Sequence, residues 1–342
     1  MKISSEKIDD LNQVLTVNVA AEDYAEARRK KLAEFQRKAE VPGFRKGKVP
    51  ASLIEKWYGE SVLGDAVNKV VGDAIQNYIE TEKLNVIGEP LPVEDQTEQD
   101  WKAGNDFEFK FDMALSPEVK LEFDKKDEVP FYNINVTEAE KKKLVDGFKK
   151  QQEAAEKAAK DENREAPQAQ SDEELAKMAA EQLSNDYKQA AEYRFQRDVK
   201  DYCINKAAVT LPEKFLRRWL IAVNQGKYTE EQIDKDFEGF LADYRWQLVM
   251  TELTKKFGIK IEEADLKEEA LNFARYQYAM YGLGNVPEEM LEDFSKKILQ
   301  DESYVQRMVE NIQFRKVIAE IKDNITVKPK KISAEKFREL DK

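Results

Sequence analysis

The chain has 342 residues, and its 68 acidic side chains outnumber 56 basic ones, which gives a formal net charge of −12. Hydrophobic residues make up 41% and charged residues 36%, a mixture that favours two or three solvated, largely helical units over one large core. Histidine is absent. This excludes Ser-His and Cys-His nucleophiles and disfavours zinc sites, so we expect no catalytic residue, metal site or cofactor.

The apolar runs are short. The segment that begins at Met1 lacks a secretory apolar core, and Trp219 to Val223 falls far below the roughly 20 residues that span a bilayer. We therefore expect a soluble, cytoplasmic protein with no membrane partner. The single cysteine, Cys203, lies in a helical pattern and is predicted to be a buried thiol.

The first elements predict a strand and two helices. Alternating apolar residues at 11–19 indicate a half-buried strand. A helix follows from about Glu22, and Pro42 and Gly43 end it. Pro50 suits the start of a second, short helix, which we expect Gly59 to end.

Another helix and a second strand complete this part. Apolar residues at helical spacing predict a helix from about Ser61 to Ile79, and Gly88 to Pro92 indicate a turn. Residues 107–115 alternate phenylalanine, methionine and leucine with polar residues, the clearest strand in the chain. We expect an α+β domain over residues 1–118.

The basic loop, residues 41–50, is the most informative segment. Residues 28–48 contain nine lysines and arginines against two acids, about +7 within an acidic chain, which favours a polyanionic partner. The glycines could merely end and begin helices, and the charges could be an ordinary solvated face. Against this stands Phe44 between Gly43 and three cations, a position from which an aromatic side chain either tucks inward or inserts into a partner.

The run Gly43-Phe44-Arg45-Lys46-Gly47-Lys48-Val49-Pro50 resembles the ribosome-docking signature GFRxGxxP of the trigger factor family of bacterial chaperones, and every fixed position is present. The resemblance implies that the phenylalanine and the cations contact protein and RNA of the large ribosomal subunit at the exit tunnel. The glycines would permit a tight backbone. The candidate ribosome-binding residues are Gly43, Phe44, Arg45, Lys46, Gly47, Lys48 and Pro50.

The middle of the chain is polar. Residues 119–152 are expected to be an extended linker followed by a helix capped at Thr137. Residues 153–172 form an Ala/Glu/Gln/Lys-rich connector, partly helical and partly disordered. Most trigger factors carry a prolyl isomerase domain here, and this sequence has no room for one. We therefore expect a non-enzyme, whether that domain was lost in evolution or deleted.

Residues 173–342 are predicted to be mostly helical. A capping box begins a long helix at Ser171, residues 209–212 break the pattern, and Thr229 caps a further helix that Gly258 ends. Helices are also predicted at 264–281, and two follow Pro287. We expect regular structure to end over Asn324 to Pro329.

In the family resembled, such a region is an elongated body with projecting helical arms that form a cradle for nascent and unfolded polypeptides. Methionine and aromatic side chains suit varied clients, although core packing is the commoner role of each alone. The candidate cradle residues are Met178, Trp219, Tyr276, Tyr278, Met280, Tyr281, Met290 and Phe294.

The resemblance implies an ATP-independent chaperone, and the sequence contains no Walker-type loop. It also leaves open a homodimer off the ribosome. Two alternatives stand beside it. An RNA-binding protein that uses the basic loop alone is disfavoured by the net charge of −12, and a ribosome-independent holdase or assembly chaperone would not use that loop.

Overall fold

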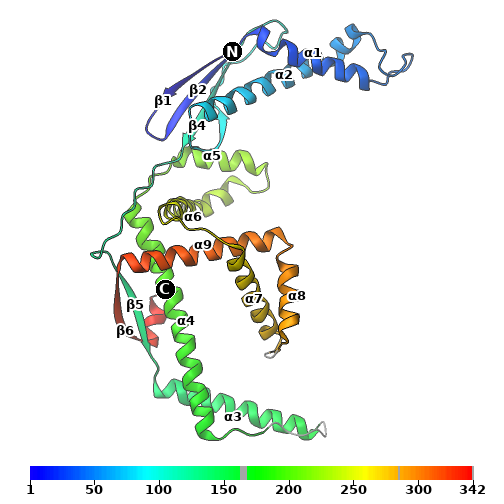
Figure 1. The fold of residues 1–342 in the computed structure, drawn as a ribbon. Coiled ribbons are helices and arrows are strands. Elements are labelled where there is room, and N and C mark those ends of the chain that lie inside the picture. The colour runs from blue at the N-terminus through cyan, green and yellow to red at the C-terminus, as the bar shows by residue number, and fades with distance from the viewer. Residues whose placement is uncertain (162–167, 284–285, 341–342) are drawn as a thin grey trace. The chain divides into compact units, whose positions relative to one another are not determined.

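The computed structural model describes residues 1–161, 168–283 and 286–340. It divides into two compact units (Figure 1), which are described separately: Met1–Glu118 with Val209–Arg245, and Val119–Ala208 with Trp246–Lys342. The sequence-based boundaries placed 209–245 in the C-terminal domain. In the structure Val209–Arg245 groups with Met1–Glu118, and α5 within this segment contacts β3 and β4.

The first unit is built on a four-stranded antiparallel sheet in the order β1-β2-β4-β3. Its strands are β1 (Lys2–Lys7), β2 (Asn12–Val19), β3 (Val86–Pro92) and β4 (Phe107–Leu115). The central pair, β2 and β4, places Leu15 opposite Phe111, so apolar side chains line one face along both strands.

The strands predicted at 11–19 and 107–115 are confirmed. The turn predicted at Gly88 to Pro92 is wrong, because these residues belong to β3, whose pairing with β4 shifts register between Ile87 and Leu91. Gly88 has a φ of 65° at this irregularity. A glycine and two prolines that accommodate an irregular strand resemble the residues of a turn in the sequence.

Two long helices, α1 (Ala21–Lys38) and α2 (Ala51–Thr81), pack on each other, and α2 contacts β1 and β2 of the sheet. The prediction that Gly59 ends a short helix is wrong, since α2 runs through it. Gly59 is buried beside the Glu55 side chain of the same helix, whose Oε1 would lie 3.1 Å from an added Cβ. The core of this unit joins Leu15 and Val17 of the sheet to Leu63 and Val67 of α2.

Helix α5 (Glu213–Asn224) contacts β3 and β4 of the same sheet. Trp219 packs so closely on Gly88 that a Cβ added there would lie 2.5 Å from the indole Nε1. Arg218 donates to the Pro92 carbonyl at 2.9 Å and pairs with Asp112. The long α6 (Glu230–Lys256) follows, and the boundary between the units falls inside it.

The second unit is mainly helical. The capping boxes predicted at Thr137 and Ser171 are confirmed by hydrogen bonds to Glu140 and Glu174. Besides the end of α6, this unit contains α3 (Glu138–Asp161), α4 (Asp172–Ala207), α7 (Glu263–Met280), α8 (Glu288–Ile298), α9 (Glu302–Asn324) and α10 (Ala334–Glu339).

The connector predicted at 153–172 is helical at both ends, because α3 continues to Asp161 and α4 begins at Asp172. The remainder of that prediction falls partly on 162–167, outside the described residues. The predicted buried thiol is confirmed, since Cys203 is fully buried on α4 and burial raises its pKa to about 12.

A two-stranded parallel sheet joins β5 (Glu128–Asn135) to β6 (Thr326–Ser333). The expectation that regular structure ends over Asn324 to Pro329 is therefore wrong. The sequence of β6 contains lysines and a proline, so it lacks the alternating apolar pattern of a strand. The strand forms because β5 provides the neighbouring strand with which it hydrogen-bonds. None of the described helices combines the length and the apolar content needed to cross a bilayer.

Candidate interaction surfaces

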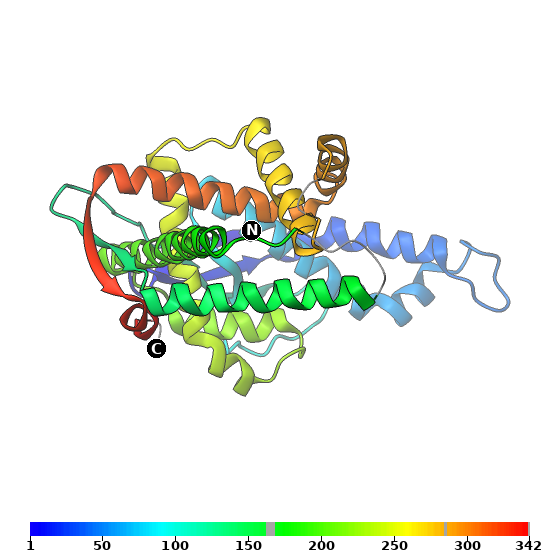
Figure 2. The same cartoon turned by 90° about the horizontal axis from the view of Figure 1, so that it is seen from below.

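The basic loop closes the α1–α2 hairpin, beyond the ends of both helices (Figures 1 and 2). Two turns shape it: the Phe44 amide donates to the Val41 carbonyl at 3.0 Å, and the Lys48 amide to the Arg45 carbonyl at 2.9 Å. Gly43 and Gly47 have φ angles of 90° and 74°, a backbone region open to glycine and strained for other residues. The expected role of both glycines thus has a structural basis.

The base of the loop is braced from α1. The Gln36 side chain donates to the Val49 carbonyl at 2.7 Å, and Val49 itself is fully buried. Phe35 stacks on Tyr58 of α2 with ring centroids 5.0 Å apart. The hairpin therefore holds the loop at both ends and leaves its middle free.

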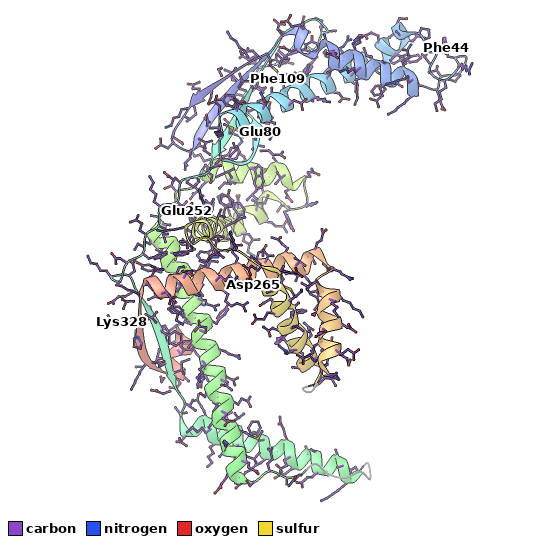
Figure 3. All side chains as sticks on the ribbon, viewed as in Figure 1. Phe44, Glu80, Phe109, Glu252, Asp265 and Lys328 are labelled. Carbon is purple, nitrogen blue, oxygen red and sulfur yellow. The ribbon has the colours of Figure 1, made fainter. Side chains whose placement is uncertain are left out.

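The middle of the loop is exposed. Phe44 keeps 41% of its surface accessible and points away from the hairpin (Figure 3). Arg45 and Lys48 are exposed and make no ion pair among the described residues, whereas Lys46 pairs with Glu40. That hydrogen bond and the charge of Lys46 lower the pKa of the Glu40 carboxyl. An aromatic side chain and two free cations thus share one short, solvent-facing segment.

The α7–α8 hairpin carries the largest group of exposed apolar side chains among the cradle candidates. Tyr281 is 80% exposed, Met280 68% and Tyr276 62%, and Met290 on α8 is also exposed. Leu283 extends the group and was missed because it lies in a loop sequence without periodicity. We call Tyr276, Met280, Tyr281, Leu283 and Met290 the α7–α8 surface.

The remaining cradle candidates differ from this group. Tyr278 and Phe294 are half-buried and pack on each other, with centroids 5.6 Å apart. Met178 is exposed on α4. Trp219 is half-buried beneath Gly88 in the first unit, and this packing removes it from a client-facing surface.

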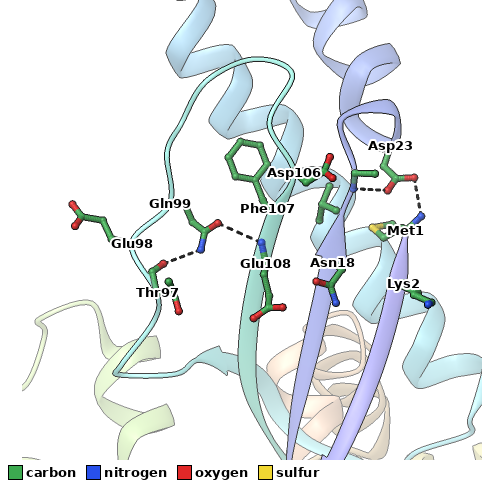
Figure 4. A pocket seen from close by; sticks show the side chains of 12 residues that line it. Met1, Lys2, Asn18, Asp23, Thr97, Glu98, Gln99, Asp106, Phe107 and Glu108 are labelled. Carbon is green, nitrogen blue, oxygen red and sulfur yellow. Dashed lines mark hydrogen bonds and ion pairs between the residues drawn. The ribbon is translucent and has the colours of Figure 1, made fainter.

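A hollow of about 590 Å³ in the first unit lies where β1, β2 and β4 meet the segment before β4 (Figure 4). The Gln99 side chain ties this segment to β4: its Oε1 accepts a hydrogen bond from the Glu108 amide at 3.4 Å, and its Nε2 donates to the Thr97 carbonyl at 2.9 Å. Its walls include Asp23 and Asp106, but nowhere among the described residues do three His, Cys, Asp or Glu side chains gather as metal ligands would. The hollow offers no catalytic arrangement.

Comparison with known proteins decides the family. A model described as "Bacterial trigger factor protein" matches residues 1–148, and one described as "Probable trigger factor, C-terminal domain" matches residues 191–340. The chain belongs to the trigger factor family. The resemblance carried by the basic loop is thereby confirmed at the level of the family.

Curated relatives agree over one segment. The trigger factor of Glaesserella parasuis serovar 5 is 35% identical over 152 residues, and that of Actinobacillus pleuropneumoniae serotype 5b is 32% identical over 152 residues. Each match covers 44% of this chain and 34% of the relative, so the matched segment spans about a third of these trigger factors.

A solved structure reported under "Promiscuous Substrate Recognition in Folding and Assembly Activities of the Trigger Factor Chaperone" has a similar fold. The TM-score is 0.52 at 14% identity, over 94% of this chain and 99% of that one. The predicted fold class, an α+β N-terminal part followed by a mostly helical part, is confirmed by this match and by the elements themselves. Between the two family matches, residues 149–190 contribute to α3 and α4 of this trigger factor.

Proposed function

We propose that this trigger factor docks through its basic loop on the large ribosomal subunit near the exit tunnel and holds nascent or unfolded polypeptides without ATP. The observation that carries docking is the exposed Phe44 beside Arg45 and Lys48, two cations without ion-pair partners among the described residues. Cations of this kind suit rRNA phosphates, and the aromatic ring suits an apolar pocket on a ribosomal protein.

Holding is assigned to exposed apolar side chains, above all the α7–α8 surface and Met178. Methionine and tyrosine adapt to many sequences, and weak contacts allow a client to leave. Docking keeps these side chains at high local concentration near emerging chains, so weak affinity suffices. We place this activity in the cytoplasm, where the ribosome and unfolded polypeptides are the partners.

The proposal includes no enzymatic step. Between the two family matches, residues 149–161 belong to α3 and residues 172–190 to α4, and the sequence between these helices is too short for the family's isomerase domain. We expect no acceleration of a proline-limited refolding reaction, and measurable acceleration would contradict this part. We also propose that the protein can form a homodimer off the ribosome, which sedimentation of the free protein would detect.

Ribosome co-sedimentation tests the proposal. Replacing Phe44, Arg45 and Lys46 by alanine should abolish pelleting, because the proposed contact with the ribosome is removed. The fold should persist, since all three side chains are exposed and the ion pair lost, Lys46 with Glu40, is itself exposed. The matched control replaces Lys177, Lys188 and Tyr193, three exposed side chains of α4, and should pellet like the parent. Suppression of aggregation of a denatured client should survive in both variants.

Two other outcomes are informative. If the loop variant pellets like the parent, docking through the loop is wrong. If the parent does not pellet but still suppresses aggregation, the ribosome-independent holdase is the better description.

A further inference from the structure

The α1–α2 hairpin has a hollow of its own, apart from the basic loop. A groove of about 320 Å³ runs between α1 and the first turn of α2. This volume is at the lower end for small-ligand sites, which suits one or two side chains of a partner. The α1 side is lined by Ala25, Arg28, Arg29, Leu32, Ala33 and Gln36, and the α2 side by Ala51, Ile54 and Glu55.

Three alanines open the groove. Ala25, Ala33 and Ala51 are exposed, whereas Ile54 is buried and Leu32 half-buried below them. Small residues at the rim and aliphatic side chains beneath create a hollow with an apolar floor. Longer side chains at the rim would fill it.

The groove also has unused hydrogen-bonding capacity. The Nε of Arg28 is buried and has no hydrogen-bond partner among the described residues, although its terminal nitrogen pairs with Glu55. Arg29 is exposed, and no described residue forms an ion pair with it. The Arg28 Nε is enclosed, so the open donors are those of Arg29, whose exposed guanidinium, unpaired among the described residues, favours a carboxylate next to the apolar floor.

From this arrangement we propose that the groove binds a short polypeptide segment that presents an apolar side chain next to a carboxylate. RNA fits less well, because the floor is aliphatic and none of the residues that line the groove is aromatic, so bases have nothing to stack on. The Glu55 carboxylate in the wall is neutralised by its ion pair with Arg28 and does not oppose a carboxylate of the partner. The site is separate from the basic loop and does not depend on ribosome docking.

Peptide binding to the whole protein tests this. The probe is a fluorescein-labelled hexapeptide of alternating leucine and aspartate, and its counterpart carries lysine in place of aspartate. Anisotropy should show saturable binding of the acidic probe that is at least about tenfold tighter than binding of the lysine peptide. Backbone amide shifts should change at residues 25–36 and 51–55.

Two variants locate the site. Ala33→Leu fills the groove and should weaken the acidic probe at least about tenfold, whereas Ser52→Leu, an exposed neighbour outside the lining, should leave binding within about twofold of the parent. Arg29→Ala should reduce the preference for the acidic over the lysine peptide. Circular dichroism should show all three variants folded, because each changes an exposed side chain.

Several results would overturn the proposal: no saturable binding, equal affinity for both peptides, or equal effects of the two leucine variants. Displacement of the probe by oligouridylate but not by unlabelled peptide would identify a phosphate site instead. None of these results depends on whether the protein pellets with ribosomes, so the docking proposal and this one can fail separately.

Discussion

The basic loop and the α7–α8 surface present their exposed side chains in different ways. The loop has a defined backbone, with two turns, two glycines at positive φ and a brace from Gln36, and it presents few side chains in fixed order. The α7–α8 surface lies on regular helical backbone that ends in a turn at Gly282, and it exposes several adaptable side chains of a helical hairpin. One partner with a fixed shape can select a motif, whereas many partners without a fixed shape select only a chemistry.

The largest effect is expected when the apolar side chains of the α7–α8 surface are removed. Replacing Tyr276, Met280, Tyr281 and Met290 by serine should reduce protection of a denatured client by about tenfold or more, since apolar contact area is lost. Ribosome pelleting should be unchanged. Light scattering of an aggregating client measures the effect, and undiminished protection would mean that clients bind elsewhere.

Trp219 sharpens the comparison, because it shares its chemistry with the α7–α8 surface but not its exposure. Trp219→Ala should lower the free energy of unfolding by about 2–4 kcal/mol, by emptying the space beneath Gly88. Chemical denaturation followed by circular dichroism gives this value. Client protection per folded molecule should stay at the parent level, and a specific loss of protection would return Trp219 to the client surface.

Asp127 allows the stability of the second unit to be tested separately from its exposed side chains. Burial raises the pKa of Asp127, but hydrogen bonds from Lys206 at 2.5 Å and from Tyr202 outweigh burial, so the net pKa lies below its ordinary value. The stabilisation is therefore complete above the unfolded-state pKa of about 3.9 and disappears as pH falls through the lower folded-state pKa.

Asp127→Asn should accordingly lower the free energy of unfolding by about 1–3 kcal/mol near neutral pH. The difference between parent and variant should narrow below about pH 4, where the parent carboxylate becomes protonated. Urea denaturation at several pH values checks both statements. If the difference in free energy of unfolding between parent and variant grows on acidification, the stated direction of the Asp127 pKa shift is wrong.

The smallest expected effect concerns the charge balance of the loop. Glu40→Gln should free Lys46 and tighten ribosome binding by about twofold, with a steeper dependence on salt, because one more cation becomes available for phosphate. Pelleting across a salt series measures this. Glu26→Gln on α1, which frees Lys30, is the matched control and should change binding less, since that pair lies away from the loop.

Local patterns predicted most of the fold. The strands at 11–19 and 107–115, the helix caps at Thr137 and Ser171, and the burial of Cys203 follow from periodicity and short-range hydrogen bonding. The failures share a cause. Gly59 lies in a continuous helix and β6 forms from a lysine-rich segment because tertiary partners override local preference.

The site was predictable to a similar degree. The loop was found from its glycines, its phenylalanine and its cations, which are local features. The α7–α8 surface was found only in part, since exposure depends on the fold and not on residue type. The groove between α1 and α2 gave no sequence signal, because alanines at helical spacing look like ordinary helix.

The parallel pairing of β5 with β6 also bears on how this chaperone is itself made. The two strands are separated by nearly 200 residues of chain, since Glu128 pairs with Thr326. During synthesis β5 lacks its hydrogen-bonding partner until residues 326–333 have been translated. A protein proposed to shelter incomplete polypeptides thus passes through a long incomplete stage of its own.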